Sequence, residues 1–106
     1  MIQEEIQERN KNVGLMLNNK FKIEFDAVYY SNWNMLIEAV EFIEKQNMQV
    51  SIIENECVII DNEKALAETN PFMIEPICAC YTSESKKEAT FIAVSDFAKL
   101  YNEKKI

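Results

Sequence analysis

The sequence contains no histidine, and glycine and arginine occur once each, as Gly14 and Arg9. Imidazole is the commonest general acid or base near neutral pH, so the catalytic sets that depend on it are excluded. A single glycine cannot build the glycine-rich loops that hold phosphate groups, which excludes the common nucleotide-binding motifs. We therefore expect neither an enzyme active site nor a bound cofactor.

Cysteine is also scarce, and the three residues present, Cys57, Cys78 and Cys80, lie in apolar segments. This setting is typical of reduced, buried thiols in a cytoplasmic protein. Cys78 and Cys80 supply only two thiolates, so a closed zinc site would need a carboxylate or a second chain to complete it. We expect no metal site, and no catalytic thiolate either, because the activating histidine is missing.

The charge is strongly one-sided, with a formal net charge of -7 and an isoelectric point near 4.6. Nucleic-acid binding depends on clustered lysine and arginine, so we expect no nucleic-acid partner. The acidic surface serves either solubility or the recognition of a basic groove on another protein. Apolar stretches are short and interrupted by charge, which predicts no signal peptide, no membrane span and a cytoplasmic location.

The length of 106 residues and the 48% hydrophobic content predict one domain over residues 1–106. Residues 1–19 have apolar side chains near helical spacing, which predicts an amphipathic N-terminal helix. Asn10, Asn12 and Gly14 weaken this helix in its middle, so we expect it to dock loosely, on the domain or on a partner.

Residues 20–30 alternate between apolar and charged side chains, in the run KFKIEFDAVYY. This is the pattern of a half-buried strand. Ser31 or Asn32 then offers a side-chain oxygen as the N-cap of a helix within residues 32–46.

The predicted helix within residues 32–46 has an unusually broad apolar face. Two neighbouring stripes form it, and their members are Trp33, Leu36, Ile37, Val40 and Ile43, with Met35, Ala39 and Phe42 beside them. The remaining polar strip is narrow, so we expect the helix to pack on a sheet and also on a second helix or another chain.

The rest of the chain predicts a hairpin, a loop, a strand and a helix. The hairpin turns at residues 54–56, where Asn55 tolerates a left-handed backbone. The loop covers residues 62–76, the strand covers residues 77–82, and Ser83 or Ser85 caps the last helix. The fold class is α+β: a small, mostly antiparallel sheet of three or four strands packed with two or three helices, in the order α-β-α-β-β-β-α.

The densest group of aromatic and amide side chains marks a candidate surface for a ligand or partner, made of Tyr29, Tyr30, Asn32, Trp33 and Asn34. Such side chains stack on and hydrogen-bond to ligands. The alternative is a purely structural role, in which Trp33 continues the buried stripe and Asn32 acts only as a cap.

Two segments, YYSNWNMLIEAVEFIEKQ and SKKEATFIAVSDFAKLYNEK, carry a resemblance over roughly residues 27–104. They resemble short uncharacterised proteins of bacteriophages, prophages and Bacteroidetes genomes, which have an aromatic-His-Ser-x-Trp helix start and a closing Ala-Val-rich helix. The matching positions are Tyr29, Ser31, Trp33, Asn34, Leu36 and Ile37, and then Ala89, Ala93, Val94, Phe97, Tyr101 and Asn102. This chain departs from the pattern at Tyr30, where histidine is usual, and at Met35 and Leu100, where tryptophan is usual. The resemblance implies phage or mobile-element ancestry and no known activity.

Three functional hypotheses follow from these observations. The first is a non-enzymatic cytoplasmic accessory protein of a phage or mobile element that binds another protein. The second is a small-molecule or nucleotide-binding module that uses Tyr29, Tyr30, Trp33 and the loop over residues 62–76. The third is a homodimer joined through its broad helix faces.

Overall fold

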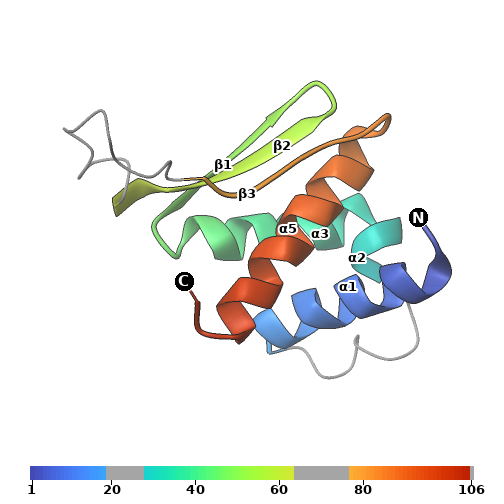
Figure 1. Cartoon of the computed structure of the whole chain (residues 1–106), viewed down its shortest axis with the longest axis horizontal. Coiled ribbons are helices and arrows are strands. Elements are labelled where there is room, and N and C mark those ends of the chain that lie inside the picture. Colours follow the sequence, from blue (N-terminus) through green and yellow to red (C-terminus); the bar gives the residue numbers. More distant parts are fainter. Residues whose placement is uncertain (19–27, 64–76, 106) are drawn as a thin grey trace.

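The computed structural model describes residues 1–18, 28–63 and 77–105. The helices in these residues are α1 (Gln3–Met16), α2 (Val28–Ser31), α3 (Trp33–Glu44) and α5 (Lys86–Asn102), and the strands are β1 (Met48–Ile53), β2 (Glu56–Asp61) and β3 (Ile77–Thr82). The strands form an antiparallel sheet in the order β1-β2-β3. All the labelled helices lie on one side of this sheet (Figure 1). The predicted α+β class is confirmed, and no described helix has the length and apolar character needed to cross a membrane.

The predicted hairpin is confirmed, but its turn is one residue shorter than predicted: Ile53 of β1 lies opposite Glu56, which is the first residue of β2. The left-handed residue of that turn is Glu54, with a φ of 53°, and not Asn55 as predicted. A two-residue hairpin turn needs positive φ at its first central residue, whichever residue is there. A left-handed non-glycine residue costs about 1–2 kcal/mol, which the pairing of the two strands offsets.

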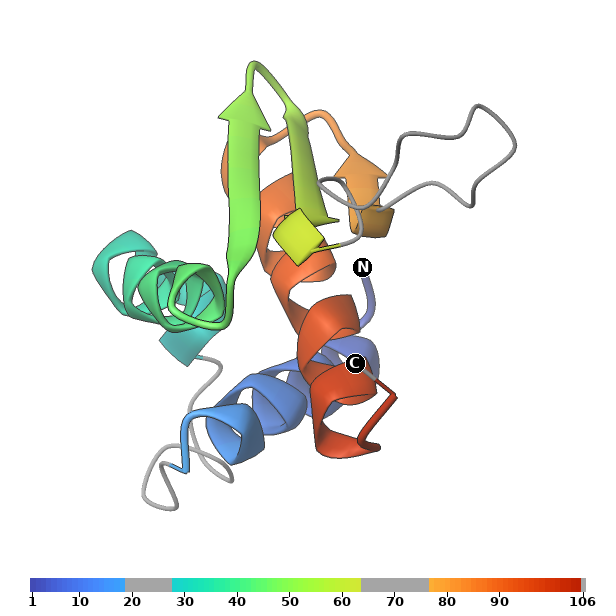
Figure 2. The same cartoon turned by 90° about the vertical axis from the view of Figure 1, so that its left-hand side faces the viewer.

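Helix α5 forms the centre of the molecule, between the sheet and α1 (Figure 2). The sequence predicts that one face of this helix covers the sheet. The structure buries every residue from Ala89 to Ser95, all round the helix, and also Phe97 and Ala98. Most of the side chains on the sheet's buried side belong to the same core, including Met48, Cys57 and Ile59.

The N-terminal turn of α5 is capped as the sequence predicts, and the cap is Ser85. Its hydroxyl oxygen accepts a hydrogen bond from the backbone N–H of Glu88 at 3.3 Å. Ser83 has a different role, because its hydroxyl donates to the Glu88 carboxylate at 2.7 Å. The sequence S-x-x-E therefore acts as a helix-start signal here, with the glutamate turned toward Ser83.

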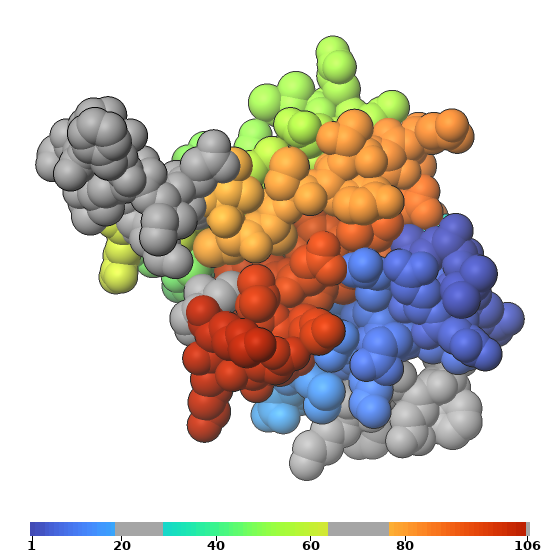
Figure 3. All heavy atoms as spheres, viewed as in Figure 1, coloured from blue at the N-terminus to red at the C-terminus, as the bar shows by residue number. Residues whose placement is uncertain are grey.

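Helix α1 packs along α5, and the atoms of the two helices lie directly against each other (Figure 3). Arg9 connects the two helices: its guanidinium donates to the Asp96 carboxylate at 2.6 Å, to the Ser95 hydroxyl at 2.9 Å and, within α1, to the Glu5 carboxylate at 3.2 Å. Burial lowers the pKa of Arg9, but the bonds and charges of Asp96 and Glu5 outweigh it and raise that pKa above its usual value. The cation is therefore fixed at the helix interface.

The prediction of a strand over residues 20–30 is wrong at its C-terminal end, because Val28–Ser31 forms the short helix α2. Residues 19–27 lie outside the described part of the chain. Tyr29 is fully buried, and its backbone N–H donates to the side-chain oxygen of Asn10 at 2.9 Å. Packing on α1 thus overrides the strand propensity of the run Val-Tyr-Tyr.

Overpacking α5 should destabilise the protein. We expect Ala93→Leu to lower the free energy of unfolding by about 1–3 kcal/mol, because Ala93 is fully buried and its neighbours leave no space for a larger side chain. The control Lys99→Leu, on the exposed side of the same helix, should change it by less than about 0.5 kcal/mol. Urea denaturation followed by circular dichroism measures both, and equal effects would contradict the central position of α5.

The Arg9 interaction should matter for the docking of α1. We expect Arg9→Lys to lower the free energy of unfolding by about 1–2 kcal/mol, because an ammonium group cannot reach Glu5, Ser95 and Asp96 together. Hydrogen exchange of the α1 amides should accelerate more than that of the strands. Lys11→Arg, at an exposed position of α1, is the control; if α1 exchange is unchanged in Arg9→Lys, another contact anchors the helix.

Candidate functional site

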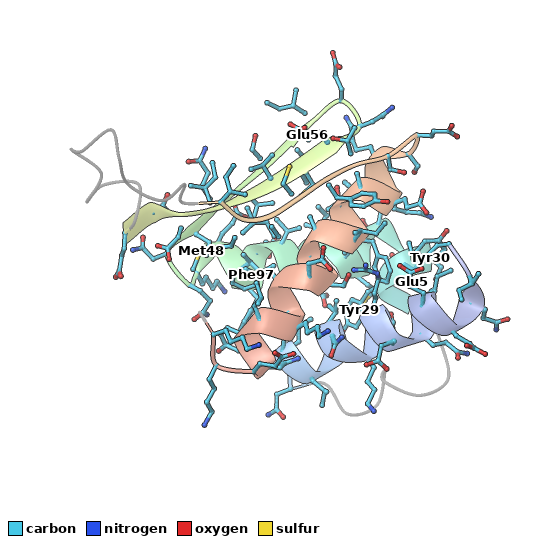
Figure 4. All side chains as sticks on the ribbon, viewed as in Figure 1. Glu5, Tyr29, Tyr30, Met48, Glu56 and Phe97 are labelled. Carbon is cyan, nitrogen blue, oxygen red and sulfur yellow. The ribbon has the colours of Figure 1, made fainter. Side chains whose placement is uncertain are left out.

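The predicted surface of Tyr29, Tyr30, Asn32, Trp33 and Asn34 is divided between core and solvent. Tyr29 has no exposed surface and Tyr30 is half-buried, whereas Trp33 is 36% exposed and Asn34 is exposed. Tyr29 and Tyr30 lie on the α1 side of the molecule, away from the sheet (Figure 4). The expectation that Trp33 continues the buried stripe of α3 is wrong, since Leu36 is the first fully buried residue of that helix.

Tyr30 is held in place by α5. Its ring packs edge-on against Phe91, with 5.2 Å between the centroids, and the Lys87 ammonium lies 5.7 Å from its centroid. Edge-on ring pairs and cation–π contacts each stabilise a fold by about 0.5–1.5 kcal/mol. Tyr30 is therefore a packing residue with an exposed edge.

Asn32 is the N-cap of α3, one of the two alternatives that the sequence left open. Its side-chain oxygen accepts from the backbone N–H groups of Asn34 at 3.0 Å and Met35 at 3.3 Å. Ser31, the other alternative, is the last residue of α2. Because this cap fixes where α3 begins, it places Trp33 at the first helical position, on the solvent side.

The exposed side of α3 continues from Trp33 as a row of carboxylates. We name this surface the α3 ridge; its members are Trp33, Asn34, Glu38, Glu41 and Glu44, all exposed. Residues three and four apart lie on the same side of a helix, and this spacing joins Asn34, the residue after Trp33, to Glu38, Glu41 and Glu44. From the sequence these glutamates were interpreted only as a polar strip; the available signal was that their series begins at Asn34, directly after Trp33.

The three thiols do not converge. Cys57 is buried in the core, Cys78 packs against the core, and Cys80 is exposed to solvent. A register shift in the pairing of β2 with β3, between Ile59 and Ile60, interrupts the alternation that would place Cys78 and Cys80 on one face. Among the described residues, no group of three or more cysteine or acidic side chains could hold a metal ion.

Two of the surface pockets lie among described residues, and Trp33 does not line either of these two. One, of about 210 Å³, lies between α1 and α5 and includes Glu5, Arg9 and Asp96. In this pocket the Arg9 guanidinium is paired with both carboxylates, Glu5 and Asp96. The other, of about 200 Å³, lies where α5 approaches the start of β1 and is lined by Met48, Tyr101 and polar neighbours.

The cysteines should differ in reactivity. Burial raises the pKa of the Cys57 thiol to about 11, so the thiol stays protonated at pH 8. Its burial also keeps the reagent away from it in the folded protein. We expect iodoacetamide at pH 8 to modify Cys80 first, Cys78 more slowly and Cys57 only after unfolding, as read by peptide mass spectrometry. Cys80→Ser should remove the fast phase, and rapid labelling of Cys57 in the native protein would contradict its buried position.

No protein-family model matches this chain, and no curated protein or solved structure matches it. The resemblance of residues 27–104 to short phage and prophage proteins stays a prediction from the sequence. The candidate site is thus defined by the chain's own geometry: an exposed tryptophan at the start of α3, followed by a row of exposed carboxylates.

Proposed function

We propose that this protein is an accessory protein of a phage or mobile element that acts by binding a basic surface of another protein through the α3 ridge. One observation carries the proposal: the only tryptophan of the chain is exposed in the first turn of a helix whose solvent side presents Glu38, Glu41 and Glu44. Interfaces are enriched in tryptophan, which often supplies much of the binding free energy.

The ridge has a suitable size and charge for this role. From Trp33 to Glu44 the helix rises roughly 16 Å, which is three turns. Carboxylates arranged in a row attract a basic partner and orient it, which raises the association rate more than the final affinity. Trp33 then contributes the apolar contact that carboxylates cannot provide.

A binding role agrees with the chemistry of the site. The ridge contains no nucleophile and no general base with an activating partner, and histidine is absent from the whole chain. The alternative of a small-molecule or nucleotide module gains no specific support, because Tyr29 is buried and Trp33 lines neither pocket.

Affinity capture with matched variants tests the proposal. The tagged protein is incubated with a lysate of its host, and captured proteins are identified by mass spectrometry. We expect an enriched basic protein whose recovery falls at least tenfold with Trp33→Ala, or with Glu38, Glu41 and Glu44 all changed to glutamine, and which is released by raised salt.

The control changes three exposed residues outside the ridge, Glu4, Glu8 and Glu54, to glutamine. It removes the same amount of charge, so a general electrostatic attraction would weaken equally in both triple variants. Equal recovery by the wild type, the ridge variants and the control would show that the ridge is not the binding surface. Circular dichroism melts confirm that each variant is folded.

A further inference from the structure

The side of the sheet that faces away from the helices carries exposed apolar side chains. We name it the outer face; its members are Gln49, Ser51, Ile53, Glu56, Val58, Ile60, Ile77, Cys80 and Thr82. All the labelled helices lie on the other side of the sheet (Figure 1). Ile53 is 66% exposed and Ile77 is 43% exposed. An antiparallel sheet covered on one side usually has polar residues on the other, so these positions break the usual pattern.

The outer face is nearly free of charge, although the chain has a net charge of -7. Its one ionisable carboxylate, Glu56, lies at the hairpin end and accepts a hydrogen bond from the Thr82 hydroxyl at 3.0 Å. The centre of the face is Val58, which is paired with Ser51 on β1 and with Cys80 on β3. A basic partner of the kind proposed for the α3 ridge would find almost no opposite charge here.

We propose that the outer face packs against the same face of a second copy, forming a two-fold homodimer of two stacked sheets. A symmetric interface brings each residue toward its own counterpart, so a face is self-complementary only if it is apolar or uncharged. In an acidic chain, most other surfaces would bring carboxylates together. On the outer face, two copies would meet with only one carboxylate from each, Glu56 at the hairpin end.

The geometry of stacked sheets makes the dimer specific. Packed sheets lie about 10 Å apart, with their side chains interdigitating. We place Val58 near the two-fold axis. Cys80 is paired with Val58 on the neighbouring strand, so the two Cys80 thiols of the dimer also lie close to the axis. Three six-residue strands cover roughly 20 by 15 Å, well below a standard interface, so the dimer should be weak.

Salt should strengthen this dimer. Each copy carries a net charge of -7, and the repulsion between two such copies decreases as salt screens it. Binding of a basic protein by the α3 ridge has the opposite dependence, because salt screens an attraction. The two associations, which use different residues, are therefore distinguishable in one titration.

Cross-linking and sedimentation test the dimer. We expect the weight-average sedimentation coefficient of the full chain to rise from low micromolar to millimolar concentration, and more steeply at high salt. A short bis-maleimide reagent should join two copies through Cys80, and Cys80→Ser should abolish most of the cross-linked product. A chain that stays monomeric at all concentrations and salts would overturn the proposal.

Charge placed on the outer face identifies the surface. We expect Ile53→Glu and Val58→Glu to reduce the cross-linked fraction at least fivefold, whereas Gln7→Glu, an equal charge on the exposed side of α1, leaves it unchanged. Ile53 is exposed enough that its variant should fold normally, which keeps the test valid if Val58→Glu does not. Equal dimerisation in Ile53→Glu and Gln7→Glu would overturn the proposal. The proposal would also be overturned if the protein stays monomeric and binds a different protein through Val58.

Discussion

The burial of α5 on all sides is the constraint on which the rest of the fold depends. From Ala89 to Ser95 this helix has no solvent-exposed side, so a single layer cannot cover it. The sheet covers one side and α1 covers the opposite side, while α2 and α3 close the gap between them. Small side chains such as Ala89 and Ala93 permit this close approach on both sides. Because every described helix is used on this side, none remains to cover the outer face of the sheet.

Helix α1 docks on the rest of the molecule through residues that have low helix propensity. Asn10 and Gly14 have low helix propensity, which predicts weak points in this helix, yet both are buried against the rest of the molecule. Asn10 lies at helical spacing between Ile6 and Val13, so it is a polar residue within an apolar stripe; that position was the available signal. Asn102 adds a third polar link, donating to the backbone oxygen of Asn12 at 2.9 Å. Loose docking of this helix remains a prediction that the Arg9 experiment addresses.

Local chemistry explains what could be predicted from the sequence, and tertiary packing explains what could not. The hairpin, Asn32 and Ser85 were within reach because turns and caps depend on a few adjacent residues. The positions of Tyr29 and Trp33 were not, because both are aromatic and only contacts with distant residues decide which one is buried. Asn10 and Phe91, far from this segment in sequence, hold Tyr29 and Tyr30 inward and leave Trp33 outside. The ridge was therefore predicted only in part.

Charge separates the two surfaces to which we assign binding roles. The carboxylates of the α3 ridge lie on a helix, and the outer face of the sheet has a single carboxylate at its edge. Neither surface shares a residue with the other, so one can be occupied while the other is bound. A dimer joined through its sheets would carry two copies of the ridge, and two linked sites bind a multivalent basic partner more tightly than one. Weak self-association would then increase the apparent affinity of the ridge, without any additional contact to the partner.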